Sequence, residues 1–161
     1  MITTTYLESP VGLLRLVADN GALAQLHMLS PDAARIDDAG PARFGAVIEQ
    51  LTAYFAGELR TFDLPLALGG TPFQERVWAA LREIPFGQTW SYGELATAIG
   101  RPTASRAGGA ANGRNPVAIV VPCHRVIAST GKLHGYAGGL ERKQLLLAHE
   151  RRVAGTELAL L

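Results

Sequence analysis

The stretch Val120-Val121-Pro122-Cys123-His124-Arg125-Val126 contains the only cysteine of the 161-residue chain. A single cysteine cannot form an internal disulfide or a four-thiolate zinc site, so it is either a buried apolar side chain or a nucleophile. Arg125, and His124 when it is protonated, would favour the thiolate and lower the pKa of the thiol from about 8.5. Adjacent side chains diverge in helices and strands, so a turn at Pro122 or an intervening water is needed to connect His124 to the sulfur. The stretch therefore predicts a reactive thiol.

The residues that flank this stretch predict how the cysteine is held. Asn115-Pro116 indicates a turn, and the apolar, β-branched run from Val117 to Val121 predicts a buried strand that ends at Pro122 and Cys123. A nucleophile at the end of a rigid strand is held more firmly than one on a loop. Further on, Gly135-Tyr136-Ala137-Gly138-Gly139 predicts either a loop in which a flat ring lies against backbone or a flexible connection.

Two short helices are predicted before the cysteine. Ser91-Tyr92-Gly93-Glu94 is a capping box that begins a helix through Ile99, which Gly100 closes. Thr103 is expected to cap the next helix, from Ala104 to about Ala111. Two short helices joined in this way form a helix-turn-helix pattern, which many antiparallel helix pairs share. In a DNA-binding protein, the second helix would lie on nucleic acid.

The second of these helices has one long side chain, Arg106, among small residues. Gly108 and Gly109 each cost about 1 kcal/mol in helix propensity, so the composition does not serve helix stability. Small side chains let the backbone approach a narrow groove closely, with Arg106 projecting into it. The alternative is close helix packing inside the protein, with Arg106 reaching solvent. Valine in place of Gly108 is expected to raise the stability of such a helix.

The first 70 residues are predicted to form a small α/β domain. Leu13 to Ala18 and Ala22 to Met28 are apolar-rich runs separated by Asp19-Asn20-Gly21, which predicts a hairpin. Apolar residues recur at helical spacing from Phe44 to Phe55, and residues 59–68 are expected to return to the sheet.

Gly69-Gly70 marks a domain boundary, because Thr71-Pro72-Phe73-Gln74 then begins a helix with a capping box and proline at the first position. Residues 140–152 predict a last helix whose inward side chains are Leu145, Leu146 and Ala148. The sequence thus predicts an α+β fold with two domains. A small N-terminal α/β domain, residues 1–70, has an antiparallel sheet and one helix. It packs on a mostly helical C-terminal domain, residues 71–161, with a winged-helix-like helix-turn-helix motif.

Charge is distributed unevenly, although the net charge of the chain is only +1. Residues 1–70 have four basic and eight acidic side chains, whereas residues 71–161 have eleven basic and six acidic ones. No Asp or Glu lies between Glu94 and Glu141, a segment that includes four arginines. This composition is typical of a surface that faces a polyanion. The alternative is a solvated loop region that happens to lack acidic residues.

The sequence has no apolar run long enough to span a membrane and no signal-peptide pattern, so we expect a cytoplasmic protein with no membrane partner.

The order and spacing of several motifs resemble the methylated-DNA–protein-cysteine methyltransferases, also called O6-alkylguanine-DNA alkyltransferases. These motifs are Ser91-Tyr92, Arg106, Asn115-Pro116, Pro122-Cys123-His124-Arg125-Val126, Tyr136-Ala137-Gly138-Gly139 and Leu147-Ala148-His149-Glu150. They cover residues 71–152, and the N-terminal part resembles the smaller domain of the family more loosely.

The resemblance implies a single irreversible transfer of an alkyl group from O6-alkylguanine in DNA, and by extension O4-alkylthymine, to Cys123. The damaged base is flipped out of the duplex, because its reacting carbon cannot be reached inside the stack. His124 then takes the thiol proton through a water, and Glu150 orients His124. Tyr92 donates toward a ring nitrogen of the leaving guanine, and Asn115 braces the turn around the cysteine.

The resemblance also implies which residues contact the nucleic acid. Arg106 fills the space that the flipped base leaves in the duplex. The other residues expected at the DNA are Tyr92, Arg101, Ser105, Ala107 and Ser129, and those expected to line the base pocket are Val126, Tyr136, Ala137 and Gly138. Ala137 stands where some members of the family have serine, so a backbone amide must serve in place of a hydroxyl.

The resemblance implies no cofactor and no metal, since a zinc site of the kind that some members have needs further cysteines. The expected partner is double-stranded DNA that contains alkylated guanine, bound by a monomer, with cooperative binding along DNA left open. Two alternatives remain: a protein that binds alkylated DNA without catalysis, and a cysteine hydrolase that uses Cys123, His124 or His149, and a carboxylate. A stoichiometric burst, tight binding without transfer, and repeated turnover distinguish the three.

Overall fold

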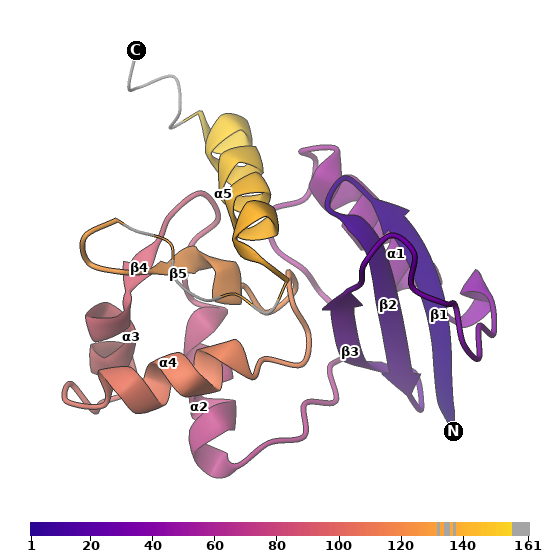
Figure 1. The fold of residues 1–161 in the computed structure, drawn as a ribbon. Coiled ribbons are helices and arrows are strands. Elements are labelled where there is room, and N and C mark those ends of the chain that lie inside the picture. Colours follow the sequence, from indigo (N-terminus) through magenta and orange to yellow (C-terminus); the bar gives the residue numbers. More distant parts are fainter. Residues whose placement is uncertain (132, 134–135, 137, 156–161) are drawn as a thin grey trace. The chain divides into compact units, whose positions relative to one another are not determined.

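The computed structural model describes residues 1–131, 133, 136 and 138–155, and the chain divides into two compact units, Met1–Gly69 and Gly70–Leu161 (Figure 1). Among the described residues, no helix combines the length and the apolar character that crossing a membrane requires.

The first unit is built on a three-stranded antiparallel sheet in the order β1-β2-β3. Strands β1 (Ile2–Ser9), β2 (Gly12–Asp19) and β3 (Ala22–Met28) follow one another along the chain. The predicted hairpin between β2 and β3 is confirmed: Asn20 and Gly21 both have positive φ, at 49° and 86°, as a two-residue hairpin turn requires. Strand β1 was not predicted, because its three threonines lack a clear apolar alternation.

A short 3-10 helix, η1 (Pro41–Arg43), leads into helix α1 (Gly45–Phe55), which confirms the helix predicted there. Residues 59–68, which were expected to return to the sheet, contribute little to it. Leu66 forms one parallel bridge with Leu23, so the segment meets the sheet at a point and is not a full strand. The core of the unit consists of side chains that are at most 3% exposed: Leu13, Leu14, Leu16, Leu23, Leu26, Phe44, Leu51 and Tyr54.

The second unit opens with the two predicted helices that have capping boxes, and both are confirmed. Helix α2 (Pro72–Leu81) begins after Thr71, whose hydroxyl accepts a hydrogen bond from the Gln74 amide while the Gln74 side chain accepts from the Thr71 amide. Helix α3 (Tyr92–Ala98) begins after Ser91 with the same reciprocal pair. Because these bonds join residues three apart, the local sequence suffices to specify them.

Helix α4 (Ser105–Gly113) packs against both α2 and α3, and α3 and α4 lie next to each other in Figure 1. The prediction that Thr103 caps α4 is wrong, because the residue at the cap is Ala104 and no side chain bonds there. Instead, the Ala104 amide bonds to the Arg101 carbonyl at 2.9 Å, so a backbone turn leads into α4. Gly100 has φ of 76° and closes α3 as predicted.

The predicted strand from Val117 to Val121 is also wrong, although four of its five residues are buried as expected. The backbone turns here, and Ile119 has a φ of 72°, a left-handed conformation that β-branched residues rarely adopt. A 3-10 helix, η2 (Cys123–Arg125), follows this turn. The cysteine therefore lies on a one-turn helix and does not end a strand.

A short parallel pair of strands connects distant parts of this unit. Strand β4 (Trp90–Ser91) lies directly before α3, and β5 (Val126–Ile127) lies directly after η2. Trp90 pairs with Val126, and Ser91 pairs with Ile127. The pairing thus brings the first residue of α3, Tyr92, to the same neighbourhood as η2.

The last helix, α5 (Leu140–Ala154), ends at Gly155, which has φ of 79°. Its buried face differs from the predicted one, because Leu145 is 46% exposed and Ala148 is also exposed, whereas Leu146 is buried as expected. The residues buried on this helix are Lys143, Leu146, Leu147, His149 and Glu150. Four of these follow the helical spacing i, i+3, i+4, i+7, so the inward face of α5 contains a lysine and a glutamate.

Candidate active site

Cys123 is only 6% exposed and is the first residue of η2. Burial raises the pKa of its thiol, and hydrogen bonds from Asn115 and Tyr136 and the charge of Lys143 lower it by less. The expectation that Arg125 and a protonated His124 lower this pKa below its ordinary value is therefore wrong. The buried cysteine of the unreacted protein is a thiol.

The His124 side chain is directed toward Glu150 on α5. Its Nε2 lies 2.7 Å from Glu150 Oε2, and both side chains are almost wholly buried. Burial lowers the pKa of His124; Glu150 opposes this shift, and Arg125 and Lys143 add to it. The other ring nitrogen, Nδ1, is buried and has no hydrogen-bond partner among the described residues. A neutral imidazole that donates from Nε2 to Glu150 therefore keeps a free acceptor at Nδ1.

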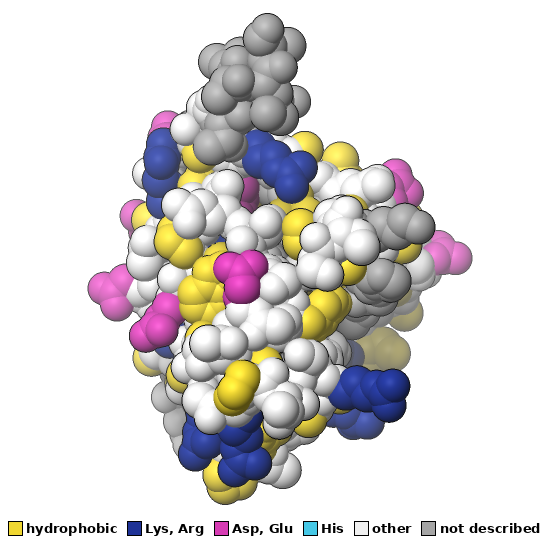
Figure 2. Space-filling model, turned by 90° about the vertical axis from the view of Figure 1, so that its left-hand side faces the viewer, with side chains coloured by type: hydrophobic (Ala, Val, Ile, Leu, Met, Phe, Trp, Pro, Cys, Tyr) yellow, Lys and Arg dark blue, Asp and Glu magenta, His cyan; other side chains and the backbone are white. Residues whose placement is uncertain are grey.

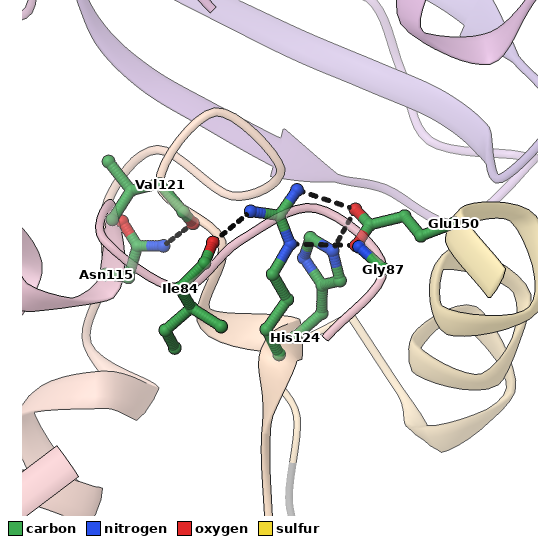
Figure 3. A network of polar contacts seen from close by, with 7 residues as sticks. Ile84, Gly87, Asn115, Val121, His124 and Glu150 are labelled. Carbon is green, nitrogen blue, oxygen red and sulfur yellow. Dashed lines mark hydrogen bonds and ion pairs between the residues drawn. The ribbon is translucent and has the colours of Figure 1, made fainter. Parts of the chain in front are cut away.

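Arg125 binds the same carboxylate with two hydrogen bonds. Figure 3 shows the Glu150 carboxylate and the His124 imidazole on one side of this network and the Ile84 carbonyl on the other. Its Nε donates to Glu150 Oε1 at 2.8 Å, its Nη2 donates to Oε2 at 3.0 Å, and its Nη1 donates to the Ile84 carbonyl at 2.8 Å. The guanidinium also lies over the ring of Phe86, 5.6 Å from the ring centroid. The charge that the sequence assigned to the thiol is thus directed at Glu150.

The Glu150 carboxylate also accepts a longer hydrogen bond from the Gly87 amide, at 3.4 Å. Burial by itself would raise the pKa of Glu150, but hydrogen bonds and charge from His124 and Arg125 hold it far below its ordinary value. Glu150 is therefore an ionised side chain that is 1% exposed and accepts hydrogen bonds from two chain segments, the loop at Gly87 and η2.

Two asparagines hold the backbone around the cysteine. The amide of Asn115 donates to the Val121 carbonyl at 2.7 Å, and its oxygen accepts from the Val117 amide at 2.9 Å. These bonds close the turn that contains Ile119. Asn112, from α4, donates to the carbonyl of Cys123 itself at 3.4 Å. Sequence reasoning did not identify Asn112 as a site residue, because nothing in the local pattern indicates that its side chain turns inward.

Tyr92 approaches the cysteine from the start of α3. Burial raises the pKa of its phenol, and the negative charge of a Cys123 thiolate raises it further. A tyrosine with a raised pKa keeps its proton and can donate a hydrogen bond. The ring also lies against α4, where a carbon added at Gly109 would be 3.2 Å from Tyr92 Cδ1.

Lys143 is a second residue that sequence reasoning missed. Its side chain is fully buried, Nζ donates to the Val126 carbonyl at 2.7 Å, and the ammonium lies 6.0 Å from the centroid of the Tyr136 ring. Burial lowers the pKa of Lys143, and the nearby Cys123 opposes this shift. The signal was present in the sequence, since Lys143 lies seven residues before Glu150 on the apolar stripe of α5.

Helix α4 presents a nearly bare outer face. Its exposed residues are Arg106, Ala107, Ala110 and Gly113, and its buried ones are Gly108, Ala111 and Asn112. Arg106 is the only long side chain on this face. In the view of Figure 2, the charged side chains at the lower end of the described surface are basic.

The other residues predicted at the DNA or in the base pocket lie in several places. Arg101 and Ser129 are exposed, Ser105 is partly exposed, and the Arg101 guanidinium lies 5.9 Å from the centroid of the Phe73 ring. Val126 is buried next to η2. Tyr136 and Gly138 are partly buried, and Ala137 lies outside the described residues.

The predicted reacting and bracing residues lie close together around η2: Cys123, His124, Asn115, Tyr92 and Glu150. Arg106 and Ala107, in contrast, lie on the exposed face of α4. Among the described residues, no group of three or more His, Cys, Asp or Glu side chains could hold a metal ion.

Comparison with known proteins covers both units. The DNA-binding domain of 6-O-methylguanine DNA methyltransferase matches residues 72–152, and the ribonuclease-like domain of the same enzyme matches residues 2–68. The methylated-DNA–protein-cysteine methyltransferase of Mycolicibacterium paratuberculosis is 53% identical over 99% of each chain. The protein of the same name from Shigella flexneri is 53% identical over 80% of this chain and 74% of its own.

Solved structures agree with these sequence matches. The O6-methylguanine methyltransferase of Mycobacterium tuberculosis has a TM-score of 0.84 at 47% identity and covers 99% of each chain. The structure of Mycobacterium tuberculosis OGT in complex with DNA has a TM-score of 0.86 at 49% identity and covers 94% of each chain. Because sequence and structure agree over both units, the chain belongs to the family of methylated-DNA–protein-cysteine methyltransferases.

Proposed function

We propose that this protein repairs DNA directly, by moving the alkyl group of an O6-alkylguanine to the sulfur of its own Cys123, with O4-alkylthymine as a second substrate. The observation that supports this proposal best is the buried group of Cys123, His124 and Glu150. It holds a single thiol, a neutral imidazole with an unpartnered Nδ1, and a carboxylate bound to the opposite ring nitrogen.

The reaction begins with proton transfer. Cys123 loses its proton to Nδ1 of His124 through a bridging water, because the two residues are adjacent on η2 and the imidazole is directed toward Glu150. Glu150 stabilises the resulting imidazolium through Nε2. The positive charge of Lys143, which opposes the burial of the thiolate, favours the same step.

The thiolate then attacks the alkyl carbon in line with the carbon–oxygen bond. A sulfur–carbon bond forms, the bond from carbon to the guanine oxygen breaks, and its electron pair stays with the guanine. Tyr92, which is protonated until this step, transfers its phenolic proton to a ring nitrogen, so that the guanine leaves as a neutral base; the tyrosinate then regains a proton from solvent, and His124 releases to solvent the proton that it took from Cys123. A thioether is a poor leaving group, so the protein is consumed, one molecule for each lesion.

Helix α4 gives the flipped base its route to Cys123. Its outer face is small enough to lie in a groove, and Arg106 occupies the space that the base vacates. Arg101, Ser105, Ala107 and Ser129 support the DNA around this point. Val126, Tyr136 and Gly138 line the pocket that receives the base.

The protein acts as a monomer in this proposal, because the chain supplies one complete set of reacting groups. A cytoplasmic location, where thiols stay reduced, suits a protein whose only cysteine must remain free.

The test is to incubate the protein with duplex DNA that contains O6-methylguanine labelled in its methyl group, and to locate the label by peptide mass spectrometry. We expect one label per protein, on Cys123, and no further turnover. Cys123→Ser should bind the duplex with unchanged affinity and accept no label. Tight binding without labelled Cys123 would favour a lesion-binding protein, and repeated turnover would favour a hydrolase.

A further inference from the structure

The buried carboxylate of Glu150 has two cationic or potentially cationic partners. Arg125 holds both of its oxygens, at 2.8 and 3.0 Å, and His124 holds Oε2 at 2.7 Å (Figure 3). Arg125 is 6% exposed, and the other two side chains are less so. A buried carboxylate needs one full positive charge to balance it. Here the guanidinium supplies that charge, so the imidazole is not required to.

We propose that Arg125 is a positioning residue: it keeps Glu150 ionised while His124 stays unprotonated, so that the imidazole can accept the proton that Cys123 gives up. This inference rests on the proposed function for its chemical meaning, since it concerns the base of that reaction. It assigns to Arg125 an action on the Glu150–His124 pair and not on the thiol.

The charge balance explains why an arginine is needed. With Arg125 present, the buried group is neutral before the reaction, and it remains neutral when one proton moves from sulfur to His124. Without Arg125, Glu150 and His124 form a pair with one excess negative charge. Such a pair takes a proton from solvent, so His124 is already protonated and cannot accept the proton of Cys123.

The other charged and titratable groups around His124 do not replace Arg125. From α5, Lys143 also lowers the pKa of His124, but its Nζ donates to the Val126 carbonyl on the Cys123 side of the site. From η2, Cys123 is a thiol in the unreacted protein. From α3, Tyr92 interacts with Cys123. Arg125 is thus the permanently charged group that the described hydrogen bonds connect directly to Glu150.

Two further contacts fix the guanidinium in place. Its Nη1 donates to the Ile84 carbonyl at 2.8 Å, and its face lies over the Phe86 ring. The ring of His149 lies edge-on to the same phenylalanine, with 6.4 Å between the ring centroids. With one donor on Ile84 and two on Glu150, the planar guanidinium has a single orientation.

The first measurement uses the protein without DNA. In Arg125→Gln, we expect His124 to be protonated at neutral pH, whereas in the unaltered protein it is neutral. Histidine-selective NMR, with the His124 signal assigned through His124→Gln, reports this state. Arg125→Lys keeps the positive charge and should keep His124 neutral, even where the loss of the second hydrogen bond lowers stability. Arg82→Gln, which removes an exposed arginine, is the matched control and should leave the His124 titration unchanged.

The second measurement follows the single-turnover rate of methyl transfer against pH. In Arg125→Gln, we expect the rate at pH 7 to fall at least about tenfold and to be regained at higher pH, because the acidic limb of the profile moves upward. A purely structural role would lower the rate by the same factor at every pH. That result, or a neutral His124 in folded Arg125→Gln, would overturn the proposal.

If Arg125→Gln does not fold, Arg125→Lys decides the matter alone: a His124 that is protonated at neutral pH in this variant contradicts the proposal. Failure of the proposed function itself is visible separately. In that case the unaltered protein would carry no label on Cys123, while the His124 titration would still report the action of Arg125.

Discussion

The two adjacent glycines of α4 should respond in opposite ways to the same substitution. A carbon added at Gly108 meets Leu95 Cδ2 at 3.9 Å, an ordinary contact. A carbon added at Gly109 meets Tyr92 Cδ1 at 3.2 Å and Cε1 at 3.3 Å, closer than carbon atoms normally approach. We therefore expect Gly108→Ala to stabilise the protein and Gly109→Ala not to.

The sizes follow from helix propensity and packing. Gly108→Ala should raise the free energy of unfolding by about 1 kcal/mol, the difference in helix propensity, and the melting temperature by roughly 2–4 °C. In Gly109→Ala the same gain is opposed by an overpacking cost of about 1–3 kcal/mol. The difference between the two variants isolates the contact with Tyr92, because both alter neighbouring positions of one helix.

The assay combines thermal unfolding with the single-turnover rate of methyl transfer. Gly108→Ala should leave the rate unchanged, whereas Gly109→Ala should lower it, since the Tyr92 ring must shift by a few tenths of an ångström. Equal stabilisation of both variants with equal rates would refute the reasoning. A melting temperature for Gly108→Ala that is unchanged or lower would count against the helical role of this glycine.

Two further predictions concern the groups that hold the site together. Asn115→Ala removes the hydrogen bonds to the Val121 carbonyl and the Val117 amide, and each backbone group left unsatisfied should cost about 1–3 kcal/mol in urea unfolding. Asn115→Asp, which keeps the acceptor for Val117, should lose less, and an equal loss in both variants would show that the donor to Val121 is the bond that matters. The pKa of Glu150 is lower in the folded protein than its ordinary value of 4.5, so its contribution to stability is present above that pH and is lost as the pH falls below about 5. Glu150→Gln should be less stable at neutral pH, because Arg125 is then buried without its counter-charge, and the gap to the unaltered protein should narrow in acid. A gap that stays constant from pH 7 to pH 3 would contradict this account.

Local signals allowed much of the fold to be predicted. The capping boxes at Thr71 and Ser91 and the hairpin at Asn20-Gly21 each depend on residues within a few positions of one another, and all three are present. The identity of the cysteine as the centre of the site also follows from the sequence, because the chain has one thiol in a distinctive stretch.

The features that could not be predicted depend on distant partners. The β-branched run 117–121 has strand propensity, but the Asn115 side chain bonds across it and closes a turn. That turn places Ile119 in a conformation that costs about 1–3 kcal/mol, a strain with no local sequence signal. Arg125 finds its carboxylate 25 residues later in the chain, so its partner could not be deduced from its neighbours.

The bare outer face of α4 has a consequence for how damage is found. The exposed positions of this helix are one arginine, two alanines and a glycine, so Arg106 is the one exposed side chain of α4 that can hydrogen-bond to the edges of bases. With so few polar contacts available on α4, we expect binding to undamaged duplex DNA to depend little on the base sequence. Under the proposed function a lesion can have any neighbouring base pairs, so the damaged guanine would be selected after it has left the stack.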